Sequence, residues 1–120
     1  MTNTLPKARK AFMQKAQEME ALAVRTGDQS YGAVIVKDDK IVGLGPSRVV
    51  VSGDPTAHAE MEAIRDASRR LKTADLSGCE MYSTSAPCAM CEAAASWANI
   101  DDLISGSDLS RGGRPRINRC

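Results

Sequence analysis

Apolar and polar residues recur along the first part of the chain with the period of a helix. Between residues 6 and 25, apolar positions lie three and four residues apart, with charged and amide side chains between them. This spacing predicts an amphipathic helix. The apolar positions are Phe12, Ala16, Met19 and Ala23. Gly27 follows the last of them, and a glycine at this point commonly ends a helix.

Two apolar runs at residues 32–37 and 40–45 come next. They flank Asp38 and Asp39, so they predict two strands joined by a tight hairpin. The first run is almost continuously apolar, which indicates a strand covered on both faces. From Pro46 to Thr56 the pattern is lost, and we expect a loop.

The second half of the chain alternates between helical and strand patterns. Residues 57–71 and 87–98 predict helices, and residues 79–84 and 102–106 predict strands. This order predicts an α/β fold with three layers, α/β/α, in which helices cover both faces of a small mixed sheet. The last two strands should be parallel, with a right-handed crossover.

Composition sets the domain organisation and the general character of the protein. The chain has 120 residues with 42% hydrophobic and 26% charged residues, which fits one globular domain over residues 1–120. We expect residues 107–120, rich in glycine and arginine, to form a tail that is flexible or ordered by a partner. The net charge of +1 gives no general attraction for nucleic acids or membranes. The low aromatic content of 3% counts against binding of long single strands.

No targeting or membrane signal is present in the sequence. The first ten residues lack the apolar run of a secretion signal. No stretch approaches the roughly 20 apolar residues that a membrane span needs. We therefore expect a cytoplasmic protein without a membrane partner.

Two short segments, each at the start of a predicted helix, carry the candidate chemistry. One runs from Asp54 to Glu60, and the other runs from Ser85 to Cys91. Residues 61–86 provide one helix, a loop and one strand between them. The two helix starts can therefore converge at one edge of the sheet.

The residue types in these segments favour a catalytic zinc site. His58, Cys88 and Cys91 are ligands that zinc prefers, and the absence of a fourth Cys or His in the cluster leaves one position for water. We expect one zinc ion per chain. The Cys-x-x-Cys pair alone also fits a redox dithiol, but the matching His-x-Glu segment favours the metal. Glu60, two residues from His58, would take a proton as hydroxide attacks a ring carbon and deliver protons to the ring nitrogen and the departing amine.

The two motifs identify a family resemblance. Over residues 32–100 the chain resembles the cytidine deaminase-like superfamily, in the branch of guanine deaminases, cytosine deaminases and tRNA adenosine deaminases. The resemblance implies zinc binding by His58, Cys88 and Cys91, proton transfer by Glu60, and a homodimer. It also implies substrate contacts by the backbone around Ala59 and Ser85. Tyr31, just before the first strand, either lines the pocket or packs in the fold.

The chain departs from the family pattern at two positions and at its end. Ser47 stands where relatives usually have an asparagine that binds the substrate, so the resemblance makes it a candidate substrate contact. A hydroxyl cannot supply an amide's paired donor and acceptor. Ala86 stands where the purine-acting branch commonly has a glutamate. Guanine deaminase-like relatives also carry a further C-terminal segment that helps to close the pocket. The departures leave the reaction class unchanged and the base preference open.

Three functions remain as hypotheses. The first is deamination of a free nucleobase or related aminated heterocycle, of guanine or cytosine type. The second is adenosine deamination in a tRNA anticodon loop, with a run of arginines gripping phosphate. The third is a zinc-bearing interaction module without turnover. The arginine run of the second hypothesis consists of Arg111, Arg114, Arg116 and Arg119.

Overall fold

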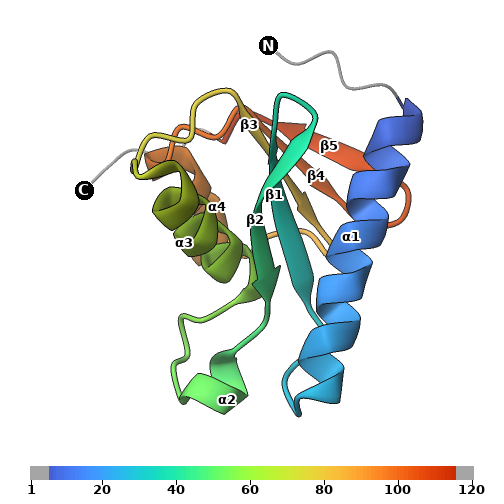
Figure 1. Cartoon of the computed structure of the whole chain (residues 1–120), viewed down its shortest axis with the longest axis vertical. Helices are drawn as coiled ribbons and strands as arrows, with labels where there is room; N and C mark the ends of the chain where they lie inside the picture. The colour runs from blue at the N-terminus through green and yellow to red at the C-terminus, as the bar shows by residue number, and fades with distance from the viewer. Residues whose placement is uncertain (1–5, 116–120) are drawn as a thin grey trace.

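Five strands form one mixed sheet in the computed structural model, which describes residues 6–115 (Figure 1). They are β1 (Gly32–Lys37), β2 (Lys40–Pro46), β3 (Cys79–Ser83), β4 (Asp102–Ser105) and β5 (Ser110–Gly113). Their order is β2-β1-β3-β4-β5. β3 and β4 are parallel, and the other neighbours are antiparallel. The predicted hairpin and the predicted parallel pair are therefore confirmed.

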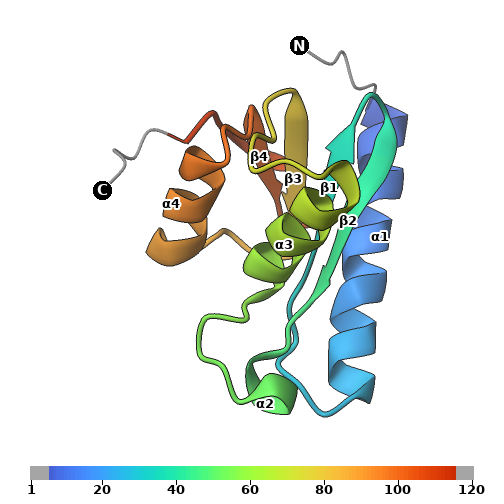
Figure 2. The ribbon, with the colours of Figure 1, turned by 60° about the vertical axis from the view of Figure 1, so that its left-hand side comes forward.

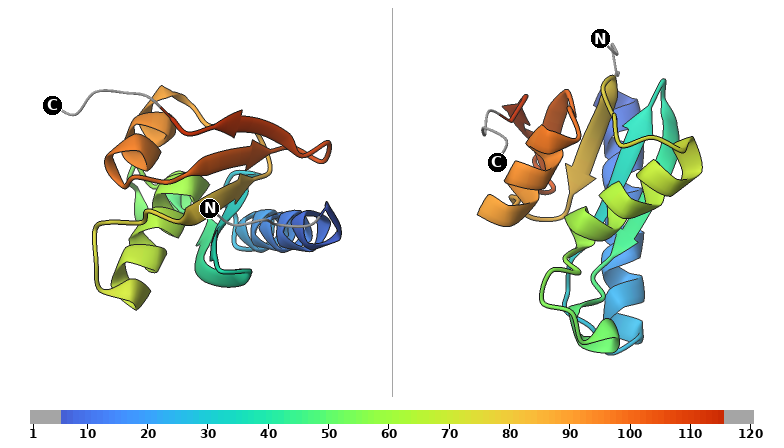
Figure 3. Two further views of the ribbon diagram at one scale, coloured as in Figure 1. Left: turned by 90° about the horizontal axis from the view of Figure 1, so that it is seen from above. Right: turned by 90° about the vertical axis from the view of Figure 1, so that its left-hand side faces the viewer.

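Helices cover both faces of this sheet. α1 (Pro6–Arg25) packs on one face, and α3 (Ala59–Leu71) and α4 (Ala89–Trp97) pack on the other (Figure 2). The right-hand view of Figure 3 shows α3 in front of the sheet and α1 behind it. This arrangement confirms the α/β/α prediction. Among residues 6–115, no helix has the length and apolar character needed to cross a membrane.

β1 lies at the centre of two apolar clusters because its side chains alternate between the faces of the sheet. Val34 and Val36 pack with Phe12 on the α1 side. Ala33 and Ile35 pack with residues of α3 and α4 on the other side. The first five residues of β1 are buried, so its continuous apolar run reflects burial on both faces.

Two glycines of β2 bring α3 against the sheet. A Cβ atom at Gly45 would lie 2.1 Å from the carbonyl oxygen of Ala59 and 2.5 Å from the backbone nitrogen of Ala63. A Cβ atom at Gly43 would lie 2.6 Å from the carbonyl oxygen of Ala63. Only glycine allows this approach, so these residues set the position of the helix that follows His58.

The expected loop between β2 and α3 contains one helical turn, α2 (Val49–Ser52). Its N-terminal N–H groups are capped from outside the segment, because the Asp28 carboxylate accepts hydrogen bonds from Val50 and Val51. Gly53 ends the turn with φ of 65°. A short sequence window could not reveal this helix, because its cap comes from the chain before β1.

Part of the tail expected over residues 107–120 forms a strand. Ser110–Gly113 pairs with β4 as the edge strand β5. The buried carboxylate of Asp102 on β4 accepts hydrogen bonds from the Arg111 side chain and from the Gly113 N–H. Pairing with β4 therefore orders a segment with little apolar character of its own. Residues 116–120 lie outside the described residues.

Candidate functional site

Two helix N-termini meet beyond the carboxyl end of β3, and each has a predicted metal ligand at its N-cap. The carbonyl of His58 accepts the first hydrogen bond of α3, from the Glu62 N–H at 2.9 Å. The carbonyl of Cys88 accepts the matching bond of α4, from the Glu92 N–H at 2.9 Å. Neither side chain caps its own helix. Cys91, in the first turn of α4, brings a third ligand to the same point.

The three ligand atoms have the spacing of a tetrahedral zinc site. Nδ1 of His58 lies 3.6 Å from Sγ of Cys88 and 3.6 Å from Sγ of Cys91, and the two sulfurs are 3.6 Å apart. Tetrahedral bonds of about 2.3 Å to sulfur and about 2.0 Å to nitrogen place ligand atoms about 3.5–3.8 Å apart. These residues therefore fit one zinc ion. Among residues 6–115 no fourth His, Cys, Asp or Glu belongs to this group, which leaves a coordination position for water.

Burial differs among the ligands and affects their protonation. Cys91 is fully buried, His58 is half-buried and Cys88 is exposed. Burial, followed by the nearby Glu60 carboxylate, raises the pKa of the Cys91 thiol. A divalent cation and the positive end of α4 both favour the thiolate. Metal binding should therefore displace a proton from Cys91.

Glu60 lies in the first turn of α3 and is only 6% exposed. Burial raises the pKa of its carboxyl, against the opposing effects of its own backbone N–H, of His58 and of the Ser83 hydroxyl. A carboxyl with a raised pKa can accept and release protons closer to neutral pH than an ordinary glutamate. Glu60 and His58 face the same cavity.

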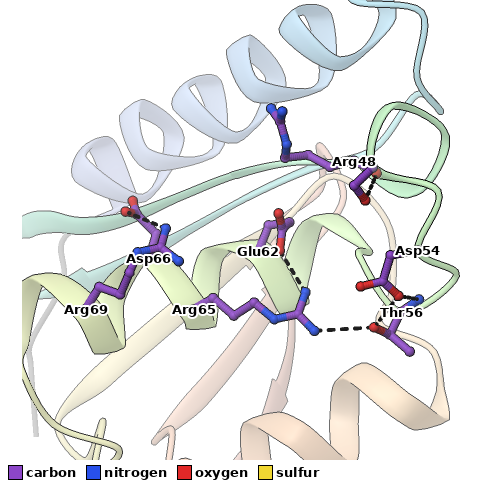
Figure 4. Close-up of polar contacts among 8 residues, drawn as sticks. Arg48, Asp54, Thr56, Glu62, Arg65, Asp66 and Arg69 are labelled. Atoms are coloured by element: carbon purple, nitrogen blue, oxygen red, sulfur yellow. Dashed lines mark hydrogen bonds and ion pairs between the residues drawn. The ribbon is translucent and has the colours of Figure 1, made fainter.

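A polar network fixes the loop that leads into His58 (Figure 4). Asp54 Oδ1 accepts hydrogen bonds from the N–H and the hydroxyl of Thr56, at 2.8 and 2.7 Å. Arg65 on α3 donates to the Thr56 hydroxyl at 3.3 Å and forms an ion pair with Glu62 at 2.7 Å. These contacts tie the loop before His58 to α3, which follows it. The backbone is therefore held on both the N-terminal and the C-terminal side of His58.

A cavity of about 540 Å³ opens beside the ligands. It is lined by Gln29, Tyr31, His58, Glu60, Ser85, Ala86 and Cys88. Tyr31 and Ser85, two of the predicted substrate contacts, therefore face the same space as the metal ligands. No motif in the sequence pointed to Gln29, which lies in the short connection between α1 and β1.

The register of the sheet explains why these distant segments meet. Ala33 of β1 pairs with Ser83 of β3. Beyond this pair, the Thr84 N–H donates to the Gly32 carbonyl at 3.0 Å, and the Gly32 N–H donates to the Thr84 hydroxyl at 3.2 Å. The residues before β1 are thereby placed beside those that follow β3.

Two other predicted substrate contacts are absent from the cavity lining. Ser47 is 1% exposed, and its hydroxyl donates to Oδ1 of Asp28 at 2.8 Å. Its side chain is engaged within the fold, so this arrangement gives no support to a substrate contact by Ser47. Ala59 is fully buried at the start of α3, so only its backbone is a candidate for substrate contact.

The described part of the arginine run is balanced by carboxylates. Arg111 Nε donates to Asp102 at 2.7 Å, and Arg114 donates to Asp101 at 2.8 Å. Each guanidinium thus lies against an acidic side chain, which weakens any attraction for phosphate. Outside the described residues lie Arg116 and Arg119.

Comparison with known proteins finds the zinc motifs and the fold together. Residues 6–107 match the family described as the cytidine and deoxycytidylate deaminase zinc-binding region. The tRNA-specific adenosine deaminase of Aquifex aeolicus is 42% identical over 103 residues, which cover 85% of this chain and 68% of that protein. The guanine deaminase of Bacillus subtilis is 42% identical over 88 residues, which cover 72% of this chain and 56% of that protein.

The fold gives the same answer as the sequence comparison. The crystal structure of the Bacillus subtilis guanine deaminase superposes with a TM-score of 0.78 at 36% identity, covering 88% of this chain and 64% of that structure. The chain thus spans about half to two thirds of the length of these relatives. Since the family match includes most of the chain and contains all three metal ligands, the chain belongs to the cytidine and deoxycytidylate deaminase zinc-binding family.

Proposed function

We propose that the protein is a zinc-dependent hydrolytic deaminase that acts on a free nucleobase or a related aminated heterocycle of guanine or cytosine type. One observation carries this proposal. The His58, Cys88 and Cys91 ligand atoms lie within 4.8 Å of one another, and the buried Glu60 lines the cavity on which His58 and Cys88 open.

The residues of the chain have separate roles in this reaction. Zinc, when bound, acts as a Lewis acid and makes water a competent nucleophile near neutral pH. Glu60 accepts a proton from the attacking water and passes it to the ring nitrogen. It then takes the proton of the hydroxyl group added to the ring carbon and transfers it to the exocyclic amino group. The carbon–nitrogen bond to this group breaks, ammonia leaves, and the ring carbon becomes a carbonyl. The backbone around Ala59 and Ser85 would orient the ring.

The charge of the cavity favours an uncharged substrate. No lysine or arginine is among its lining residues within the described part of the chain. The two described arginines near the end of the chain face aspartates. A site that grips phosphate usually offers uncompensated basic side chains. The present lining suits a neutral heterocycle better.

Adenosine deamination in tRNA is the second candidate, because the comparisons favour it. tRNA-specific adenosine deaminases are the more numerous among the similar proteins. Binding of an anticodon stem-loop would depend strongly on salt, since each phosphate contact releases counterions. Binding of a free base would show little salt dependence.

The deciding experiment is ammonia release by the zinc-loaded chain. The substrates are free bases, nucleosides, aminotriazines and an anticodon stem-loop. We expect release from a free base and a loss of about 100- to 10,000-fold in kcat for Glu60→Ala, with zinc content unchanged. The matched control is Glu18→Ala, which removes an exposed carboxylate on α1 that does not line the cavity.

The outcomes separate the three functions. Release from the stem-loop alone would overturn the free-base assignment and establish the second candidate. Equal rates for Glu60→Ala and the unmodified chain would remove Glu60 from the mechanism. Absence of release from every substrate, with zinc bound, would favour a zinc-bearing interaction module.

We also propose that the protein acts as a homodimer. Several large apolar side chains are exposed, Trp97 among them at 39%. Exposed apolar surface is commonly covered by a second subunit. Light scattering coupled to size exclusion tests this, and a monomer mass at micromolar concentration would contradict it.

A further inference from the structure

Gln29 is an exposed residue in the lining of the cavity that His58 and Cys88 also line. Its backbone is fixed on both sides. The Gln29 N–H donates to Asp28 Oδ1 at 2.8 Å, and its carbonyl accepts from the Tyr31 N–H at 2.8 Å. Its exposed side chain lines the cavity and has no hydrogen bond to any other residue in the range 6–115. The backbone is therefore held while the amide remains available to a ligand.

Asp28 is the residue that holds this segment in place. Its Oδ1 accepts from the Ser47 hydroxyl at 2.8 Å, in addition to the Gln29 N–H. Its Oδ2 accepts from the N–H groups of Val50 and Val51, at 2.9 and 2.8 Å. The carboxylate thus joins the end of α1, the segment after β2 and the cavity wall. A second link runs from the Ser47 N–H to the Tyr31 carbonyl at 3.1 Å.

We propose that Gln29 is the specificity-determining residue of the deaminase site and that Asp28 is the positioning residue that holds it there. This inference rests on the proposed function, because it assumes that the ligand of the cavity is an aminated ring. It assigns recognition of the ring edge to a residue outside the zinc motifs.

The chemistry of the lining favours Gln29 for this role. Nucleobases differ in the order of hydrogen-bond donors and acceptors along their edges. A carboxamide presents a donor and an acceptor side by side in one plane, whereas a hydroxyl presents a single oxygen. Among the described lining residues, Gln29 has the one carboxamide, and Tyr31 and Ser85 offer hydroxyls. A paired amide contact discriminates between bases by about 10- to 100-fold.

The test measures binding and turnover separately on the zinc-loaded full chain. Dissociation constants for adenine, cytosine and guanine are measured by calorimetry in a Glu60→Ala background, which keeps the ligand intact. The same constants are measured for two further variants. Gln29→Leu removes the donor and the acceptor at similar side-chain size, and Gln29→Glu offers acceptors only. Gln14→Leu is the matched control, because Gln14 is an exposed glutamine on α1 outside this cavity. Ammonia release is measured in parallel with Glu60 present.

We expect Gln29→Leu to weaken binding of the preferred base by about 10- to 100-fold, so that the three bases bind with similar affinity and their ranking is levelled. Gln29→Glu should change the order of that ranking, and Gln14→Leu should leave it unchanged. An unchanged ranking in Gln29→Leu would overturn the inference, even if ammonia release confirms the deaminase. A levelled ranking without ammonia release from any base would support Gln29 and reject the proposed function. Absence of binding by all three bases would overturn the Gln29 inference.

Discussion

Two parts of the cavity are built in different ways. One is the metal corner, which consists of His58, Cys88 and Cys91, and the other is the wall that carries Gln29. His58 and Cys88 are the N-caps of two helices, and their neighbours in sequence supply the rest of the corner. The wall depends on Asp28, which accepts hydrogen bonds from residues 19 to 23 positions further along the chain. Two short sequence motifs therefore mark the reactive groups, which folding brings together from 30 positions apart, whereas no motif marks the residues that hold the wall.

Substitutions in the two regions should therefore have different effects. Substitution of a ligand in the metal corner should abolish both zinc binding and turnover. Substitution in the wall should change which base binds preferentially, while zinc binding is retained. Each of the following variants tests one part of that contrast, in order of decreasing effect.

Loss of a ligand should have the largest effect. Cys91→Ala removes the buried thiol that lies 3.6 Å from both other ligand atoms. Because loss of a residue that merely supports a ligand already costs about 10- to 100-fold in metal affinity, we expect more than about 100-fold weaker zinc binding here. Competition with a chromogenic chelator measures this affinity.

The control for that variant is Cys79→Ala. Cys79 is also buried, and burial raises the pKa of its thiol to about 11, so it remains protonated at neutral pH. It lies in β3 and outside the ligand group. Equal zinc affinity in the two variants would contradict the assignment of Cys91 as a ligand.

A change behind α3 should disturb the metal corner through packing. Gly45→Ala would place a Cβ atom 2.1 Å from the Ala59 carbonyl oxygen, so α3 must move away from β2. We expect a loss of about 3 kcal/mol in the free energy of unfolding, measured by urea denaturation. Gly112→Ala is the control, since its Cβ atom would meet the nearest atom at an ordinary 3.6 Å. Similar unfolding midpoints for the two variants would show that α3 can accommodate the methyl group.

A change at Asp28 should affect the wall and spare the metal. Asp28→Asn replaces one acceptor oxygen by a donor that faces N–H groups. We expect KM for the preferred base to rise about 10-fold, with kcat and zinc content little changed, because Gln29 is no longer held. Steady-state kinetics separate the two constants. Asp39→Asn, in the exposed turn between β1 and β2, is the control. A fall in kcat with unchanged KM would contradict the positioning role.

The same variant also has a predicted pH dependence. Burial opposes ionisation of Asp28, but its hydrogen bonds from Val51, Gln29, Ser47 and Val50 prevail and lower its pKa below 3.8. A group with a lowered pKa stabilises the fold above its unfolded pKa and loses this contribution as the pH falls through the folded value. The difference in stability between the unmodified chain and Asp28→Asn should therefore be larger at pH 7 than at pH 3. Urea midpoints at the two values test this, and an equal difference would contradict it.

Sequence by itself determined the elements whose signals are local. The helical period and Gly27 defined α1 at Pro6–Arg25, and the Asp38-Asp39 pair defined the hairpin, in which both residues have positive φ. The zinc ligands were also readable, because a metal requires specific donor types at short spacings near helix starts. Each of these signals lies within a few neighbouring residues, although the two halves of the zinc site, 30 positions apart, meet only in the fold.

Tertiary structure decided the features whose partners lie far away in the chain. β5 exists because β4 offers an edge and a buried Asp102, and α2 exists because Asp28 caps it from outside. Ser47 resembled a substrate contact in sequence, but in the fold its hydroxyl is bound to Asp28. No sequence motif marked Gln29, because its position in the cavity depends on the register between β1 and β3 and on the Asp28 carboxylate. The physical reason is that hydrogen-bond partners brought together by folding cannot be inferred from local spacing.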